Sequence, residues 1–469
     1  MTSVKKVPHL TAAERAARGK AARAAASRSR QGAWEPAADR PDVVDLLEEQ
    51  AASRVPELVP LRYGRMLVSP FTFFRGAAYP MAADLAGEPR TGLTVQLCGD
   101  AHLSNFGAFA APDRRMVFGL NDFDETLPGP FEWDVKRLAA SFAVAGRDRQ
   151  FSAKQRAVVN RTVVQGYRDE MQRLAGMPNL DLWYDRIHLE EIAELAMAQG
   201  TAKQRKRFER NAAKAQSKDN MRALGKLTTE VDGEPRIISD PPLIVPIEEI
   251  AAGVAEEEIE QFLRGVLRSY RRTLTTDRRH LLEQFRYVHA ARKVVGVGSV
   301  GTRAWVVLML GRDASDPLFL QLKEAQPSVL EPFLGKSKFP KHGQRVVEGQ
   351  RLTQAATDIM LGWIQVTAPD GVARDFYVRQ LWDGKGSALV ELMDPNAMTF
   401  YAQLCGQALA KAHARSGDAI AISAYLGTGD TFDRAMSTFA ETYADQNERD
   451  YDALRAAVAS GRVTAESPA

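Results

Sequence analysis

Several short segments of this 469-residue chain carry side chains that could act on a phosphate group. The first, Cys98-Gly99-Asp100-Ala101-His102-Leu103-Ser104-Asn105, follows the apolar run Leu93 to Leu97, which predicts a short strand. An Asp and an Asn on one loop can present a base and a metal ligand to the same phosphate. The alternative for Asp100 and Asn105 is that both side chains simply cap turns, as Asp and Asn often do.

The second segment, Leu120-Asn121-Asp122-Phe123-Asp124-Glu125, ends a predicted strand at Met116 to Leu120. A short hairpin would return this segment to the loop that carries Asp100. Carboxylate oxygens are ligands that Mg²⁺ prefers, so we expect Asp122 to bind the metal. Asp124 is either a second metal ligand or an acid in a turn.

The first segment resembles the catalytic loop of aminoglycoside-phosphotransferase-like kinases, which reads H-G-D-x-H-x-x-N. The matching residues are Gly99, Asp100, His102 and Asn105. Cys98 stands where the family has His. The resemblance implies that Asp100 is the catalytic base and that Asn105 binds metal, and we expect no catalytic role for His102.

The second segment is similar to the metal-binding Asp-Phe-Gly segment of kinases, with Asp122 as the Mg²⁺ ligand and Asp124 in place of the glycine. The resemblance continues through Gly129-Pro130-Phe131-Glu132-Trp133-Asp134-Val135, which is similar to the stretch that opens the next helix in aminoglycoside-type kinases. It implies that Asp134 is structural and either braces the catalytic loop or caps the helix.

A third segment, Val294 to Gly301, contains the pattern G-x-G-x-x-G. We expect its backbone to hold phosphates, at Gly296, Gly298, Ser299 and Gly301. A Rossmann dinucleotide site needs a helix after the third glycine, whereas Thr302 to Val307 has the pattern of a strand. Strand, glycine loop and strand is the order found in kinases, and an ordinary glycine-rich hairpin is the alternative.

The fourth segment, Leu318 to Ala325, is a mostly apolar strand that ends near Lys323. It resembles the Val-Ala-Ile-Lys strand of kinases, which makes Lys323 the candidate phosphate clamp. In kinases a helix glutamate pairs with this lysine. We expect Glu348 to be that partner, with Glu331 as the reserve.

The order of these segments is unusual, because the glycine loop follows the catalytic loop by about 190 residues. A circular permutation accommodates this order, since chain ends can move without changing which elements pack together. We therefore predict an α+β, protein-kinase-like fold with two lobes, circularly permuted and with extra helices. Phe376 to Leu381 resembles the hinge strand between the lobes.

Changes in composition and periodicity predict the division of the chain. We expect a basic mobile arm or frayed helix at 1–42, a helical C-lobe-like part with the catalytic loop at 43–290, a β-rich N-lobe-like part at 291–385 and C-terminal helices at 386–469. Over nearly all of 43–450 the chain also resembles one bacterial family, the domain of unknown function numbered twenty-two fifty-two. That resemblance implies no substrate.

Composition limits the remaining possibilities. With 62 Lys and Arg against 59 Asp and Glu, the net charge of +3 gives no general attraction to nucleic acid or anionic membrane. No apolar run approaches the roughly 20 residues that cross a bilayer. The two cysteines, Cys98 and Cys405, are expected to be buried and reduced, and we expect a cytoplasmic protein.

Basic side chains outside these motifs allow two interpretations. The arginine-rich arm and the polar segment Gln204 to Lys226 are either solvated or contact an acidic partner or nucleic acid, which we rank last. Arg75, Arg379 and Lys385 either bind phosphate or substrate anions, or form surface salt bridges.

These observations lead to one main hypothesis of function: phosphoryl transfer from Mg²⁺-bound ATP to an unidentified hydroxyl acceptor. A nucleotide-binding pseudokinase and a kinase-fold enzyme that transfers AMP are alternatives. A metal-dependent hydrolase built on Asp100, His102, Asp122 and Asp124 is a further one, although it would leave the glycine loop and Lys323 unused.

Overall fold

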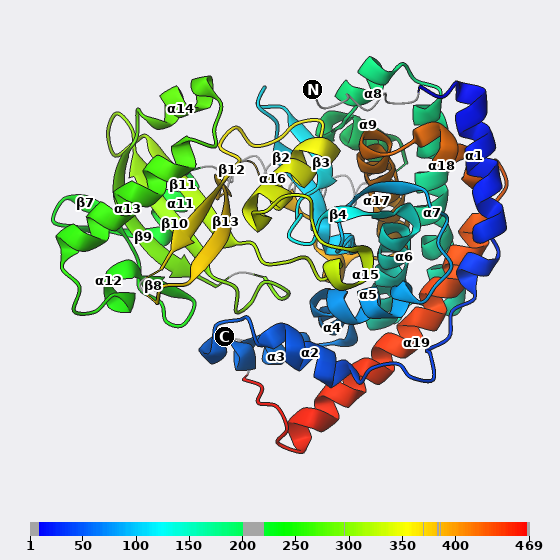
Figure 1. Ribbon diagram of the computed structural model, residues 1–469, viewed down its shortest axis with the longest axis horizontal. Coiled ribbons are helices and arrows are strands. Elements are labelled where there is room, and N and C mark those ends of the chain that lie inside the picture. Colours follow the sequence, from blue (N-terminus) through cyan, green and yellow to red (C-terminus); the bar gives the residue numbers. More distant parts are fainter. Residues whose placement is uncertain are drawn as a thin grey trace, which may run out of the picture.

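The structure, a computed structural model, describes residues 9–199, 220–294, 296–368, 370–381, 384 and 386–466. These residues form a mixed α+β fold with several antiparallel sheets, which confirms the predicted α+β class. No helix among them is long and apolar enough to cross a membrane. Figure 1 shows a sheet part (the described residues of 220–381) beside a helical part (9–199 and 386–466).

The sheet part is built on one antiparallel sheet. Among the described residues it has six strands, in the order β12-β13-β11-β10-β9-β8. Their bounds are β8 Ile244–Pro246, β9 Arg286–Lys293, β10 Ala304–Leu310, β11 Pro317–Glu324, β12 Gly362–Thr367 and β13 Ala373–Gln380.

Helices cover both faces of this sheet. Side chains alternate between the faces of a strand, so α13 (Glu256–Arg271) shares a core cluster with Leu320, whereas α11 (Asn220–Leu227) shares another with Phe319. Strand β11 is consequently buried along its whole length. A charged residue at its end, such as Lys323, therefore needs a partner inside the protein.

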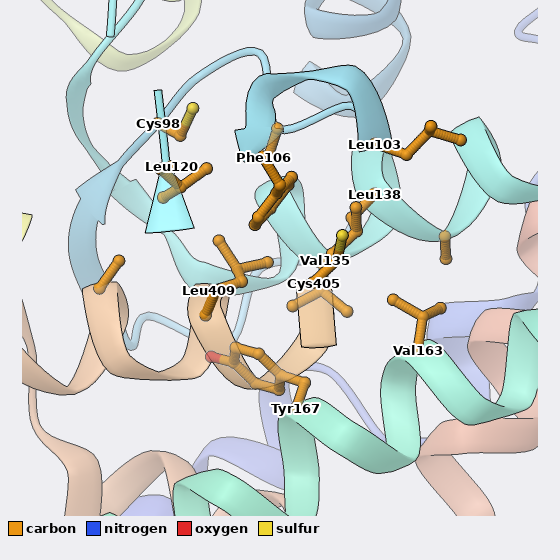
Figure 2. Close-up of a cluster of buried hydrophobic side chains, with 14 of the residues drawn as sticks. Cys98, Leu103, Phe106, Leu120, Val135, Leu138, Val163, Tyr167, Cys405 and Leu409 are labelled. Atoms are coloured by element: carbon orange, nitrogen blue, oxygen red, sulfur yellow. The ribbon is translucent and has the colours of Figure 1, made fainter. Parts of the chain in front are cut away.

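The helical part packs around long helices. These are α6 Phe131–Asp148, α7 Ala153–Ala175, α17 Pro395–Ser416 and α19 Thr431–Ala459. Figure 2 shows side chains of α6, α7 and α17 meeting Leu103 from the predicted catalytic loop and Phe106, which directly follows it. Cys98 and Cys405 lie in the same cluster, free and buried as expected.

Short strands hold the loops that the sequence singled out. Strand β1 (Thr94–Leu97) pairs with β4 (Leu127–Pro130), and β2 (Phe106–Ala110) pairs with β3 (Met116–Leu120). The predicted catalytic loop therefore joins β1 to β2, and the predicted metal segment joins β3 to β4. The strand predicted at Met116 to Leu120 is confirmed. Strands β5 (Ile187–His188) and β14 (Gly386–Ser387) complete the sheet of β2 and β3.

The remaining described helices and strands are shorter. They are α2 Val43–Ala51, α3 Val59–Met66, α4 Pro70–Gly76, α5 Ala78–Ala86, α8 Asn179–Tyr184, α9 Leu189–Gln199, β6 Thr228–Val231, β7 Glu234–Ile237, α12 Ile247–Ile250, α14 Thr276–Leu282, α15 Glu331–Leu334 and α16 His342–Thr353.

The basic N-terminal arm, predicted as a mobile arm or a frayed helix, contains a well-formed helix that packs on the protein. Residues Ala12–Ala25 form helix α1, which packs against α18 (Ala419–Leu426), as Figure 1 shows. Arg23 Nε donates to the Tyr425 carbonyl at 2.9 Å, and Arg28 Nη1 donates to the Leu426 carbonyl at 2.8 Å. The last carbonyls of a helix have no partners within it, so these arginines cap α18.

One further boundary differs from the sequence interpretation, and one predicted segment is only partly described. The division expected at residue 290 falls inside the sheet part, because β8, α11 and α13 belong to the sheet and its covering helices. Most of the polar segment Gln204 to Lys226 lies outside the described residues, and its last seven residues belong to α11.

Candidate functional site

Most of the predicted site residues line one large cavity between the two parts, whereas Gly301, Lys323 and Glu348 do not. Its volume is about 1060 Å³. The helical part contributes the catalytic loop and the metal segment, and the sheet part contributes the glycine loop. The predicted site residues that line the cavity are Asp100, Asn105, Asp122, Asp124, Gly296, Gly298 and Ser299. Segments nearly 200 residues apart in the chain thus meet at this cavity.

Lys323 joins the sheet part to the metal segment. It is only 3% exposed, and its Nζ lies 2.7 Å from Asp124 Oδ2 and 3.6 Å from Asp122 Oδ2. The Tyr377 hydroxyl donates to Asp124 Oδ1 at 2.7 Å. Burial by itself would raise the pKa of Asp124, but the Lys323 ammonium and the hydrogen bonds from Lys323 and Tyr377 lower it to about 2. Asp124 is therefore the ionised partner of Lys323.

Asp100 is held by an arginine of α6. Arg137 Nη2 lies 2.7 Å from Asp100 Oδ1 and Arg137 itself stacks on Phe74, with its guanidinium 4.0 Å from the ring centroid. Burial raises the pKa of Asp100, and the charge of Arg137 opposes that rise. The other carboxylate oxygen, Oδ2, is 3.7 Å from His102 Nε2. The carboxylate is thus fixed through one oxygen.

Asn105 is oriented by the loop that it closes. Its Nδ2 donates to the Asp100 carbonyl at 2.7 Å. Because a carbonyl oxygen can only accept, this bond assigns the amide nitrogen and leaves the side-chain oxygen as the group that could bind a cation. The Asn105 carbonyl in turn accepts from the Asn121 N–H at 2.8 Å, which joins the catalytic loop to the metal segment.

Asp134 braces the start of the catalytic loop. Its carboxylate accepts from the Cys98 N–H at 2.7 Å and the Gly99 N–H at 3.0 Å. His413 Nε2 lies 3.2 Å from the same carboxylate, and His413 Nδ1 lies 2.9 Å from the Tyr167 hydroxyl. The Cys98 thiol donates to the Asp122 carbonyl at 3.2 Å, so the residue that departs from the kinase pattern joins both segments.

The glycine loop is held against the N-terminal helices. Arg65 Nη1 donates to the Gly296 carbonyl at 2.7 Å, and the Val55 N–H donates to the Gly301 carbonyl at 2.8 Å. Gly296 and Gly301 have positive φ values of 69° and 88°. The Ser299 hydroxyl lies 3.4 Å from Asp124 Oδ2, so the loop reaches the metal segment directly.

A family model decides where this chain belongs. The family is described as uncharacterized protein conserved in bacteria (DUF2252), and its model matches residues 54–457. The chain belongs to this family. No curated protein and no solved structure matches the chain. The DUF2252 match runs from Arg54, which lines the cavity, into α19, so it includes both groups of segments that build the site.

The predicted pairing of Glu348 with Lys323 is wrong. Glu348 lies on the outer side of α16, where its Oε1 is 3.1 Å from Arg351 Nη1. The inward side of this helix carries Arg345, which donates to the carbonyls of Asp124 and Gln326, each at 2.8 Å. The reserve candidate Glu331 lines the cavity and faces His342, at 3.7 Å, instead of Lys323.

Sequence reasoning missed several residues of the site. Tyr377 and Arg345 hold Asp124, and Arg54 donates to the Val300 carbonyl in the glycine loop. Tyr377 stood in the strand that was compared with a hinge, but no motif distinguishes it. Arg54 and Arg345 lie outside the recognised motifs and approach the site only in the folded structure, so no local pattern could identify them.

The other basic residues considered from sequence are divided. Arg379 donates to the Asn121 carbonyl at 3.1 Å and so supports the metal segment, although it does not line the cavity. Arg75 lines the cavity itself. Lys385 lies outside the described residues.

The donor set fits Mg²⁺ that is shared with phosphates. Asp122 and Asn105 line the cavity and offer oxygen atoms, the ligands that Mg²⁺ prefers. Among the described residues no group of three or more His, Cys, Asp or Glu side chains could hold a metal ion by itself. Mg²⁺ commonly takes one or two carboxylates and completes its shell with water and substrate phosphates, so these residues suit it better than an all-protein metal site.

A glycine in the catalytic loop provides a direct test of how closely the two segments must pack. Gly99 has a φ of +86°, and a Cβ there would lie 2.3 Å from the Glu125 carbonyl oxygen. We expect Gly99→Ala to lower the free energy of unfolding by roughly 2–4 kcal/mol, because backbone strain and a clash with main chain add together. Urea unfolding measures this loss.

Gly461→Ala is the matched control for Gly99→Ala. Gly461 also has a positive φ, +78°, but a Cβ there would meet nothing within 4 Å. This variant should lose only the strain, about 1 kcal/mol. Equal losses in the two variants would contradict the close contact between Gly99 and the metal segment.

Proposed function

We propose that this protein is an ATP- and Mg²⁺-dependent phosphotransferase with a circularly permuted, kinase-like fold of two lobes. The observation that carries the proposal is that Lys323 and the glycine loop, from the sheet part, meet Asp122 and Asp124, from the helical part. Phosphoryl transfer requires such parts: a cation and a backbone loop for phosphates, metal ligands, and a carboxylate near the attacking hydroxyl. A single motif can have a purely structural explanation, but such an explanation does not account for the convergence of several motifs at one site.

The order of elements in the sheet part supports a kinase-like arrangement. Strand β9 leads into the glycine loop, β10 follows, and β11 carries Lys323 near its end. Strands β10 and β11 are antiparallel, with Ala304 opposite Lys323. The start of β10, directly after the loop, therefore lies beside the lysine, as phosphate binding by both would require.

The residues of the candidate site have definite roles in this proposal. Asp100 orients the acceptor hydroxyl and accepts its proton, and the raised pKa that burial gives this carboxylate makes it a better base. Arg137 fixes the orientation of Asp100. Asp122 and Asn105 would hold Mg²⁺, which supplies charge to the phosphates when bound. Lys323 and the glycine loop would hold the phosphates.

A pseudokinase is the second candidate, and the pairing of Asp100 favours it. In a protein that only binds nucleotide, Asp100 could serve Arg137 alone, because their ion pair of 2.7 Å satisfies one carboxylate oxygen. The hydrolase alternative has less support, since no group of three metal-ligating side chains is found among the described residues. Transfer of AMP would use the same cavity.

Nucleotide binding tests the proposal. Mg-ATP at 100 times its Kd should stabilise the protein by about 2.7 kcal/mol, and ATP without Mg²⁺ should stabilise it much less. We expect Asp122→Asn to weaken Mg-ATP binding roughly 10–100-fold, because the amide loses the charge that binds the metal. Isothermal titration calorimetry measures the affinity.

Asp113→Asn is the control for this measurement. Asp113 is an exposed acid in the turn between β2 and β3 and lies outside the cavity. Its removal should leave the affinity for Mg-ATP unchanged. The proposal fails if wild-type protein does not bind Mg-ATP, or if Asp122→Asn binds it as tightly as Asp113→Asn does.

Product masses separate the remaining candidates. Incubation with Mg-ATP and hydroxyl acceptors should yield ADP and a phosphorylated product. AMP transfer would instead release pyrophosphate and add the larger AMP group. A pseudokinase would bind Mg-ATP and form neither product.

A further inference from the structure

Arg75 is a partly buried cation of the cavity wall, and it has no hydrogen-bond or ion-pair partner among the described residues. It stands in the last turn of α4 and lines the cavity. Among the described residues its guanidinium makes no hydrogen bond or ion pair, and its Nε is fully buried without an acceptor. Burying an unpaired charge costs free energy. We therefore expect this guanidinium to have a functional role that offsets its cost in stability.

Other arginines of the same cavity are paired. Arg303 lies 3.3 Å from Glu324, and Arg374 forms an ion pair with Asp370. These residues line the cavity too, so an unpaired guanidinium is not a general property of its wall. A third, Arg54, donates to the Val300 carbonyl, whereas the Arg75 guanidinium has neither an ion pair nor a hydrogen bond among the described residues.

The position of Arg75 relates it to Asp100 rather than to the metal segment. The carboxylates whose charges act on Arg75 are those of Asp100 and Glu391. Lys323, by contrast, is held by Asp122 and Asp124. The two cations therefore serve different regions of the cavity, and the Arg75 region contains the predicted base.

The backbone of Arg75 also abuts the glycine loop. Its carbonyl oxygen lies 3.2 Å from the place where a Cβ on Gly298 would be. Arg75 thus lies beside the phosphate-binding loop, and it lines the same cavity as Asp100. An acceptor must lie between this loop and Asp100 for its hydroxyl to reach both a phosphate and the base.

We propose that Arg75 binds an anionic group of the acceptor, so that the acceptor is a hydroxyl compound carrying a phosphate or a carboxylate. An arginine can hold either group with two parallel hydrogen bonds. This inference rests on the proposed function. In the transfer, the acceptor oxygen bonds to the γ-phosphorus, the bond from that phosphorus to the β–γ bridging oxygen breaks, ADP leaves with the electron pair, and Asp100 takes the hydroxyl proton.

Stability distinguishes a binding role from a structural one. We expect Arg75→Met to unfold at the same temperature as wild type or a higher one, because it replaces a partly buried, unpaired charge with an apolar side chain of similar length. Arg303→Met, which breaks the pair with Glu324, should unfold at the same or a lower temperature. A clear destabilisation by Arg75→Met would indicate a structural arginine and overturn the inference.

Anion binding tests the site itself. Inorganic phosphate and acetate are titrated in turn into protein that is saturated with a non-hydrolysable Mg-ATP analogue, so that the nucleotide region is filled. We expect at least one of the two anions to bind, and Arg75→Met to weaken that binding at least 10-fold while Arg303→Met changes it less than 2-fold. Binding of phosphate alone indicates a phosphorylated acceptor, and binding of acetate alone a carboxylated one.

The outcomes separate this inference from the proposed function. If the analogue binds but neither anion does, or if Arg75→Met binds the anion as wild type does, the inference fails and the proposed function stands. If the analogue does not bind, the proposed function fails, and the titration is made without it. Arg75-dependent anion binding then supports the anion site, and Arg75-independent binding, or none, overturns it.

Discussion

Lys323→Met should lower the free energy of unfolding by about 3–5 kcal/mol, because it leaves two carboxylates at the cavity without their cation. The Lys323 ammonium lies 2.7 Å from Asp124 and 3.6 Å from Asp122, and the lysine is 3% exposed. The same carboxylates keep the pKa of Lys323 above its usual value although burial acts to lower it. Methionine fills the space but supplies no charge.

Magnesium should restore part of this loss. A divalent cation can neutralise the carboxylates that Lys323→Met leaves unpaired, so Mg²⁺ should stabilise this variant more than it stabilises wild type. Urea unfolding with and without millimolar Mg²⁺ measures the difference. Under the proposed function the variant should also lose most Mg-ATP-dependent turnover, since it lacks the lysine that would hold the phosphates.

Lys336→Met provides the matched control. Lys336 lines the cavity, but it is exposed and has no ion pair among the described residues. Its replacement should change the free energy of unfolding by less than about 0.5 kcal/mol. If Lys323→Met cost less than about 1 kcal/mol, the ion pair with Asp124 would not hold the two parts together.

Segments of the site that are continuous in sequence could be recognised from the sequence alone. The loop at 98–105, the metal segment and the glycine loop each carry their pattern within eight residues or fewer. Strand β11 could be recognised as well, because a short apolar run bounded by turn signals is consistent with a buried strand. The structure brings all of these segments to one cavity.

Partners from distant segments could not be predicted in the same way. Asp124 was interpreted as a metal ligand or a turn acid, whereas it pairs with Lys323 and Tyr377. The pairing depends on how the sheet part meets the helical part, and no local pattern encodes that. Glu348 is a different case: Val346 and Val347 are both buried in α16, and helical periodicity then directs Glu348 outward.

The prediction for the N-terminal arm was based on its composition. Its apolar residues are mostly alanines, which bury little surface each, so the arm was expected to be mobile. Small side chains also let helices approach closely, and α1 packs against α18 in this way. The arginines that suggested a solvated segment instead cap the end of α18 through Arg23 and Arg28.

Asp134 is the buried acid on which the geometry of the catalytic loop depends. It is 1% exposed, its Oδ2 accepts from the Cys98 N–H and its Oδ1 from the Gly99 N–H, and Oδ2 also lies 3.2 Å from His413 Nε2. If His413 Nε2 carries the proton, its Nδ1 accepts from the Tyr167 hydroxyl. Both ring nitrogens of His413 then have a hydrogen-bond partner. Helices α6, α7 and α17 are thereby joined at the start of the catalytic loop.

Asp134→Asn should therefore cost about 3–5 kcal/mol, because an amide has one oxygen for these donors and turns its NH₂ toward another donor. At least one buried N–H then loses its acceptor. Hydrogen exchange should show reduced protection at the Cys98 and Gly99 amides, beyond the global loss measured by urea. Asp148→Asn, an exposed change on the same helix, should alter neither quantity. Unchanged exchange at these two amides in Asp134→Asn would mean that another group holds the loop, and Asp100 would then be positioned by Arg137 alone.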